Sequence, residues 1–194
     1  MNNFILANHT SINLNFIIYI KNLYENYNRD IETTNLFPWL PIEKSALIDK
    51  KVLDIKIKEV WQVVFNTIST FNNMVEQDIK YWESQSTQFR ELFSQNAVGK
   101  EAFEIVKKSF ESWYWGIGND ICNSFSDNLV EDYYNNLKNI VNEKGVSLIS
   151  KHFYLQVVFN YPDTNWELKN TNMIIISPTN LLPQTEELFE LCKE

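Results

Sequence analysis

The sequence has few of the residues that interrupt helices or that build covalent and metal frameworks. Its 194 residues include only four glycines and five prolines, which favours long helices over tight turns. The two cysteines, Cys122 and Cys192, have no CxxC partners, so they cannot form a framework of several disulfides or a cysteine-based structural zinc site. This cysteine usage predicts a reducing compartment, and we expect a cytoplasmic protein.

Long apolar runs and a basic first segment are also missing. No run approaches the roughly 18 residues of a transmembrane helix, and residues 1–9 lack the charged start and apolar core of a signal peptide. The formal net charge of −8 disfavours nucleic acids and anionic membranes, because phosphate recognition requires clustered lysine and arginine. A basic protein or a cationic ligand is the kind of partner that this charge favours, although solubility alone is sufficient reason for the charge.

Hydrophobic residues make up 44% of the chain and aromatic residues 14%, which indicates a folded protein with a bulky core. The strongest pattern runs from Val52 to Trp82, where apolar residues recur at steps of three and four. This spacing predicts one α-helix of roughly 45 Å at about 1.5 Å per residue. We expect its buried positions to include Leu53, Ile57, Val60, Trp61, Val64, Ile68, Phe71, Val75 and Ile79.

Four further segments carry helical spacing. Thr10 or Ser11 can cap a helix that continues to about residue 31, and shorter helices are predicted at about 84–98 and 100–115. Gly116-Ile117-Gly118 predicts a turn, and a helix then runs from residue 119 to Gly145, a glycine stop signal. The apolar segment 35–42, with two prolines, predicts either a plug across the core or an exposed contact site.

The period changes to two after residue 152. Apolar side chains alternate from Phe153 to Tyr161, which predicts a half-buried strand. A turn at residues 162–164, a return strand around 166–169, a third strand at 173–176 and a short helix after Thr185 complete the interpretation. The fold class is therefore predominantly helical α+β, with about five helices and a small C-terminal antiparallel β-meander packed against them. We expect a single domain over residues 1–194, helical over 1–145 and a meander with a short helix over 146–194.

The most suggestive polar set is an acidic stripe. Asp120, Asp127 and Glu131 recur at intervals of seven and four on one face of the helix after Gly118. Three carboxylates so arranged can bind a hard cation such as Mg²⁺, meet basic residues of a partner, or simply form a solvated helix side. Trp115, next to this stripe, is a candidate interface aromatic. We therefore take Trp115, Asp120, Asp127 and Glu131 as the candidate partner-binding residues.

No catalytic, metal or cofactor site is predicted. His152 lies on the polar side of the first predicted strand, and His9 lies in a segment that we expect to be mobile. Neither histidine has a nucleophile or an orienting carboxylate at motif spacing, and the chain has no HExxH or GxSxG.

A non-catalytic protein-binding module is the function that these observations favour. Its most specific form is a bacterial immunity protein or antitoxin that neutralises a basic toxin through an acidic surface. The alternatives are a carboxylate-based, metal-dependent hydrolase and a structural subunit of a phage or another assembly. The sequence predicts no particular oligomeric state.

Overall fold

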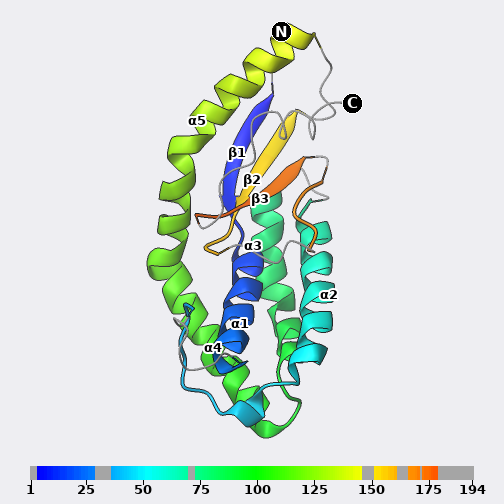
Figure 1. Cartoon of the computed structure of the whole chain (residues 1–194), viewed down its shortest axis with the longest axis vertical. Coiled ribbons are helices and arrows are strands. Elements are labelled where there is room, and N and C mark those ends of the chain that lie inside the picture. Colours follow the sequence, from blue (N-terminus) through cyan, green and yellow to red (C-terminus); the bar gives the residue numbers. More distant parts are fainter. Residues whose placement is uncertain are drawn as a thin grey trace.

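A bundle of helices and a small β-sheet lie side by side along one long helix (Figure 1). The computed structural model describes residues 4–28, 36–69, 73–145, 151–160, 166–170 and 172–178. In chain order the elements are β1 (Ile5–Thr10), α1 (Ile12–Asn28), η1 (Lys44–Ala46), α2 (Lys50–Ser69), α3 (Met74–Gln85), η2 (Ser86–Leu92), α4 (Ala97–Trp113), η3 (Tyr114–Gly118), α5 (Asn119–Lys144), β2 (His152–Val157) and β3 (Met173–Ile176).

The central apolar pattern forms two helices, so the prediction of one helix over 52–82 is wrong. α2 ends at Ser69, and α3 starts after Asn73, whose side chain accepts the backbone N–H of Glu76 and so caps the new helix. Most predicted inward positions of α2 are buried: Leu53, Ile57, Trp61, Val64 and Ile68. Val75 and Ile79 of α3, also expected inside, are about 40% exposed (42% and 40%) because they border a pocket described below.

The predicted turn at Gly116-Ile117-Gly118 is also wrong. α4, η3 and α5 form one continuous helix from Ala97 to Lys144, about 70 Å long at 1.5 Å per residue, and η3 is a π-helical turn within it (Figure 1). Gly118 has α-helical dihedral angles, so flexibility is not what requires a glycine there. A Cβ at Gly118 would lie 2.6 Å from the Trp113 ring, so the glycine allows that ring to pack against the helix.

The three strands form a parallel sheet in the order β1-β2-β3, so the antiparallel meander is wrong. β1, for which no strand was predicted, pairs with β2 from Ile5↔His152 to Thr10↔Val157. All the helices of the described residues lie between these two strands in the chain, and a parallel pair requires such a long crossover. Residues 166–170 form no strand beyond an isolated antiparallel bridge, Lys169↔Ile174, so the predicted return strand is wrong as well.

The sheet separates two hydrophobic cores. On one face, Leu6, Leu155 and Ile174 pack against Cys122 and Leu137 of α5. On the other face, Met173 and Ile175 join the large aromatic core of the helix bundle. The long helix continues past the bundle and covers the sheet, so residues of its middle stretch lie where bundle, sheet and helix meet (Figure 1).

The segment with two prolines lies against the bundle but is not fully buried. The Phe37 ring packs on Tyr19, Trp113 and Phe159 and is still 48% exposed, and Trp39 stacks on Tyr27 at 54% exposure. The segment therefore covers the core only in part, and its role as a contact site for a partner stays a prediction. The predicted turn at 162–164 and the predicted helix after Thr185 lie outside the described residues.

Within the described residues, no helix is both long enough and apolar enough to cross a membrane.

Candidate ligand-binding pocket

A pocket of about 440 Å³ lies at the C-terminal end of β1. The C-terminal ends of parallel strands commonly border binding sites, because the chain leaves the sheet there and helices begin. Its size lies within the range of small-ligand sites, roughly 300–1,000 Å³. Residues of β1, α1, α3, η3 and α5 line it: Asn8, His9, Thr10, Ile12, Val75, Asp78, Ile79, Tyr114, Trp115, Asn119, Asn123 and Asp127.

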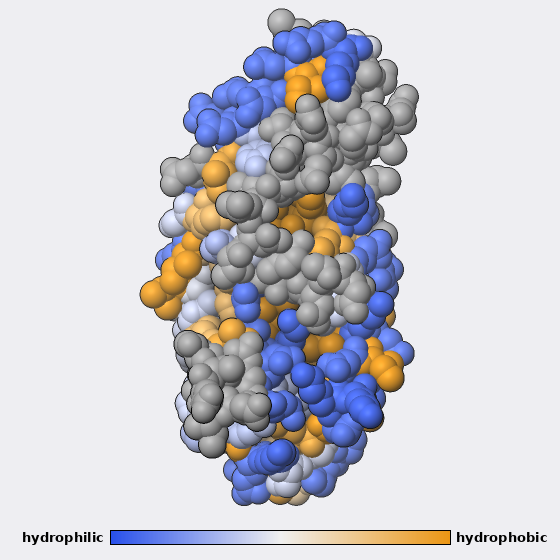
Figure 2. Space-filling view, in the orientation of Figure 1, coloured by the Kyte–Doolittle hydropathy of each residue, from blue (hydrophilic) through white to orange (hydrophobic). Residues whose placement is uncertain are grey.

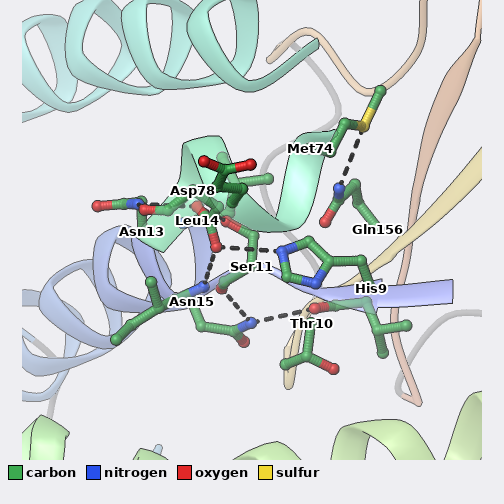
Figure 3. Close-up of polar contacts among 12 residues, drawn as sticks. His9, Thr10, Ser11, Asn13, Leu14, Asn15, Met74, Asp78 and Gln156 are labelled. Atoms are coloured by element: carbon green, nitrogen blue, oxygen red, sulfur yellow. Dashed lines mark hydrogen bonds and ion pairs between the residues drawn. The ribbon is translucent and has the colours of Figure 1, made fainter. Parts of the chain in front are cut away.

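A carboxylate from α3 organises one wall of this pocket. Asp78 is 1% exposed, and its Oδ2 lies 3.2 Å from Nε2 of His9 (Figure 3). The same carboxylate accepts hydrogen bonds from the backbone N–H of Ile12, the hydroxyl of Ser11 and the side-chain amide of Asn13, all at 2.7–2.8 Å. With a proton on Nε2, the imidazole of His9 donates to Asp78, and this contact fixes the orientation of the ring.

These contacts also make Asp78 a cap for α1. The first N–H groups of a helix have no intrahelical acceptor and carry partial positive charge, so a carboxylate there is stabilising. Ser11 adds a second cap, since its hydroxyl oxygen accepts the backbone N–H of Leu14. The helix terminus thus stabilises the Asp78 carboxylate, and among the described residues no lysine or arginine pairs with it.

The opposite wall is a row of side chains on the long helix. Trp115, Asn119, Asn123 and Asp127 follow one another at four-residue intervals, so they lie along one side of it. Two hydrogen bonds tie this row to β1: Asn8 Nδ2 donates to Asp127 Oδ1 over 2.9 Å, and the Thr10 hydroxyl donates to Asn123 Oδ1 over 2.8 Å. The row is therefore held at a fixed position relative to the His9–Asp78 wall.

The π-helical turn η3 places two aromatic residues at different depths. Tyr114 is buried, its hydroxyl donates to the carbonyl of Thr10 over 2.5 Å, and burial followed by the charge of Asp78 raises its pKa. Trp115 stands edge-on to the Tyr114 ring, with centroids 4.9 Å apart, and is 60% exposed at the pocket mouth. π-turns often occur at functional sites because they change the direction of neighbouring side chains.

The pocket contains part of the arrangement of groups found in hydrolytic sites. An imidazole oriented by a carboxylate is two thirds of a hydrolytic triad, but no serine, threonine or cysteine among the described residues hydrogen bonds to His9. Burial raises the pKa of the Cys122 thiol to about 12, which removes it as a nucleophile near neutral pH. The described residues also contain no group of three or more His, Cys, Asp or Glu side chains placed to hold a metal ion.

The structure brings two of the four predicted site residues to the pocket. Trp115 and Asp127 line it. Asp120 and Glu131 are exposed on the same helix and do not line the pocket. The expectation that His9 is mobile is wrong: it lies in β1, opposite Gln156 of β2.

Sequence reasoning missed the His9–Asp78 pair. A signal for Asp78 was present, because it lies four residues after Met74 and four before Trp82, both buried, which places an acid within an apolar row. Gln156 is another buried polar residue near this pair. Its amide nitrogen contacts the sulfur of Met74 at 3.6 Å (Figure 3). Its Oε1 has no hydrogen-bond partner among the described residues.

Comparisons with known proteins suggest no function, so the proposal below depends on the geometry of this site. No protein-family model matches the chain, and neither the curated proteins nor the solved structures contain a significant match.

Proposed function

We propose that this protein is a non-catalytic binding module for a basic protein, and that it binds through the surface around Trp115 and Asp127. The observation that carries this proposal is a set of large apolar side chains held in solvent beside carboxylates. Trp115, Ile117 and Ile121 are 60%, 55% and 49% exposed within seven residues of one rigid helix. Exposed apolar side chains grouped in this way are typical of protein interfaces.

The acidic residues of this region supply charge of the sign that a basic partner requires. Ile117 and Ile121 are exposed beside Asp120, and Asp127 and Glu131 follow Asp120 along the helix at intervals of seven and four residues. Figure 2 shows hydrophobic surface along the left flank of the molecule, on the side where Figure 1 shows the long helix. Together with the net charge of −8, these carboxylates would accelerate encounter with a cationic protein.

In its most specific form, the proposal is an immunity protein or antitoxin that neutralises a basic toxin in the bacterial cytoplasm. A rigid, preorganised surface suits such a role, since little conformational entropy is lost on binding. The helix that carries the surface is anchored at both ends, by the bundle and by the sheet, and hydrogen bonds to Asn8 and Thr10 anchor its middle. The alternatives of a metal-dependent hydrolase and of an assembly subunit stay predictions that no contact in the described residues favours.

The test is affinity capture from the native host with the full chain as bait. We expect a basic protein to be enriched and its capture to weaken as salt is added, because exposed charges are screened. The variant Asp120→Asn/Asp127→Asn/Glu131→Gln should capture at least about tenfold less of it.

A charge-matched control separates a specific surface from net charge. The variant Asp54→Asn/Glu59→Gln/Glu91→Gln removes three exposed carboxylates from α2 and η2 and changes the net charge equally. It should capture as much partner as the unaltered chain. Equal losses in both variants, or capture of no basic protein, would contradict the proposal. Co-expression of the captured protein with and without this chain then tests neutralisation directly.

A further inference from the structure

β1 is an edge strand, so half of its backbone groups face away from the sheet. It pairs with β2 on one side, and no described residue pairs with it on the other (Figure 1). The backbone N–H of Ile5 donates to the carbonyl of Lys151, so the backbone groups of Ile5 point toward β2. Because this direction alternates along a strand, the backbone groups of Asn8 and Thr10 point toward the free edge.

Most of these edge groups have no partner. The Thr10 carbonyl accepts the hydroxyl of Tyr114, as expected for a carbonyl that points away from β2. Among the described residues, no hydrogen bond reaches the N–H of Thr10 or the N–H and carbonyl of Asn8. Unpaired N–H and C=O groups on an edge strand can pair with a strand of another chain.

The pocket described above follows this free edge. Side chains of successive strand residues point to opposite faces of a sheet. His9 contacts Asp78 of α3 on one face, whereas Asn8 and Thr10 contact α5 on the other. The pocket touches all three consecutive residues and both helices, so it passes around the edge of β1, with α3 and α5 as its two walls.

The α5 wall carries side chains at nearly the repeat of an extended chain. It is a row at four-residue intervals: Trp115, Asn119, Asn123 and Asp127. Four residues of a helix advance about 6 Å, and alternate residues of a strand advance about 6.6 Å. The whole row is about 18 Å long, so it exceeds any single side chain and matches a strand of about five or six residues.

The two walls differ in chemistry. On α3, Val75 and Ile79 are four residues apart and are 42% and 40% exposed. On α5, one carboxylate oxygen of Asp127 accepts from Asn8, and among the described residues the other oxygen has no partner. No lysine or arginine lines the pocket. A strand that alternates apolar and basic residues complements both walls, because its successive side chains would face α3 and α5 in turn.

We propose that an extended segment of the basic partner pairs with the free edge of β1 as an added strand; this inference rests on the proposed function. Its backbone bonds to the free groups of Asn8 and Thr10, its apolar side chains cover the α3 wall, and a basic side chain pairs with Asp127. Main-chain hydrogen bonds supply the affinity of such a contact, and the alternating side chains supply its specificity. Because Tyr114 occupies the Thr10 carbonyl, the pairing ends at that residue.

The test uses a synthetic probe and the full chain, so it does not depend on the partner. An acetylated and amidated hexapeptide of alternating lysine and valine is titrated while NMR follows the backbone amides. We expect saturable shifts and slower hydrogen exchange at Asn8 and Thr10, whose N–H groups face the free edge. A peptide with the same side chains and an N-methylated backbone should bind at least about tenfold more weakly, as should hexalysine.

Two substitutions at one position separate backbone pairing from the side chain. Asn8→Pro removes an N–H that faces the free edge and keeps the bonds to β2, because proline is tolerated at such edge positions. Asn8→Ala removes the same side chain and keeps the N–H. The proline variant should bind the probe at least about tenfold more weakly than the alanine variant. Thermal melts show whether both are folded.

A second pair of variants leaves β1 unaltered, so it decides the question if Asn8→Pro does not fold. Val75→Lys/Ile79→Lys replaces the apolar α3 wall by positive charge and should weaken binding of the probe at least about tenfold. Ile55→Lys/Val63→Lys changes two exposed apolar residues of α2 (63% and 52%) and the net charge equally. This control should bind the probe as tightly as the unaltered chain.

The outcomes distinguish this inference from the proposed function. Unchanged exchange at the Asn8 and Thr10 amides, equal binding of the N-methylated peptide, or full affinity in Val75→Lys/Ile79→Lys would overturn the added strand. So would equal affinities of folded Asn8→Pro and Asn8→Ala. Capture of a basic protein through the surrounding surface would then still stand. Conversely, edge pairing by the probe with no basic protein captured would leave the β1 edge assigned and the protein-binding proposal rejected.

Discussion

The carboxylate of Asp78 accepts the backbone N–H of Ile12 over 2.8 Å, so a side chain of α3 caps α1 across the interior of the protein. The two residues are 66 positions apart in the chain. Because Ile12 lies two residues after the last residue of β1, the same contact sets the direction in which the chain leaves the sheet. It also places His9 against the pocket, 3.2 Å from Asp78. One buried acid therefore links the helix bundle, the sheet and the candidate site.

Replacing Asp78 by alanine should destabilise the protein by about 3 kcal/mol or more. The change leaves the N–H of Ile12 and the Ser11 hydroxyl buried without an acceptor, and each unsatisfied group costs about 1–3 kcal/mol. It also removes one of the two acceptors of the Asn13 amide, which keeps the backbone carbonyl of residue 78. Urea unfolding measures the loss. Glu83→Ala, an exposed acid in the same helix, is the control and should change stability by no more than about 0.5 kcal/mol. A loss below about 1 kcal/mol for Asp78→Ala would contradict this assignment.

The two glycines of the π-helical turn should respond to alanine in opposite directions. A Cβ at Gly118 would lie 2.6 Å from the rigid Trp113 ring, whereas a Cβ at Gly116 would meet nothing within 4 Å. Gly118→Ala should cost about 1–3 kcal/mol through overpacking. Gly116→Ala should stabilise by about 0.5–1 kcal/mol, because alanine loses less backbone entropy in a helix. Thermal melts compare the two, and equal effects would show that the Trp113 contact is not what requires a glycine.

The helices could be predicted because their signal is local. Leu53, Ile57, Trp61 and Ile68 recur at the period of a helix, and burial of that side follows whatever packs against it. The break between α2 and α3 could not be seen in the same way, since apolar spacing continues through it and only Asn73, a capping residue, marks the start of α3. The π-turn could not be predicted either. Two glycines at 116 and 118 are typical of a turn, but the chain stays helical there.

The sheet and half of the site depend on contacts distant in sequence. β1 pairs with β2 across more than 140 residues, and alternation within one strand does not reveal the direction of its neighbours. Trp115 and Asp127 could be identified as surface candidates from their own helix. His9 could not, because its significance comes from Asp78, which α3 brings to it from 69 positions away.

The Cys122 thiol should be almost inert in the folded protein. It is fully buried between α5 and the sheet, and burial raises its pKa from 9.0 to about 12, so very little thiolate is present at pH 8. In a Cys192→Ser background, alkylation by iodoacetamide at pH 8 should be at least about 100-fold slower than in the chain unfolded in guanidinium. Comparable rates in the two states would mean that α5 does not stay packed on the sheet.

Tyr114 should make the stability of the protein depend on pH in the alkaline range. Burial, reinforced by the charge of Asp78, raises its pKa above the ordinary value of 10.0, so the folded chain keeps a proton that the unfolded chain loses. The stability from this group is complete below pH 10 and falls as pH rises further, by up to about 1.4 kcal/mol per pH unit.

Tyr114→Phe removes both this titration and the hydrogen bond to the Thr10 carbonyl. Below pH 9 the variant should therefore be about 1 kcal/mol less stable than the unaltered protein, the usual net value of one buried hydrogen bond. Above pH 10 only the unaltered protein loses the contribution of Tyr114, so the difference should shrink and then change sign. Urea unfolding of both proteins at pH 8, 9, 10 and 11 measures it. A difference that stays constant over this range would mean that Tyr114 titrates alike in the folded and unfolded chains and is not shielded beneath Trp115.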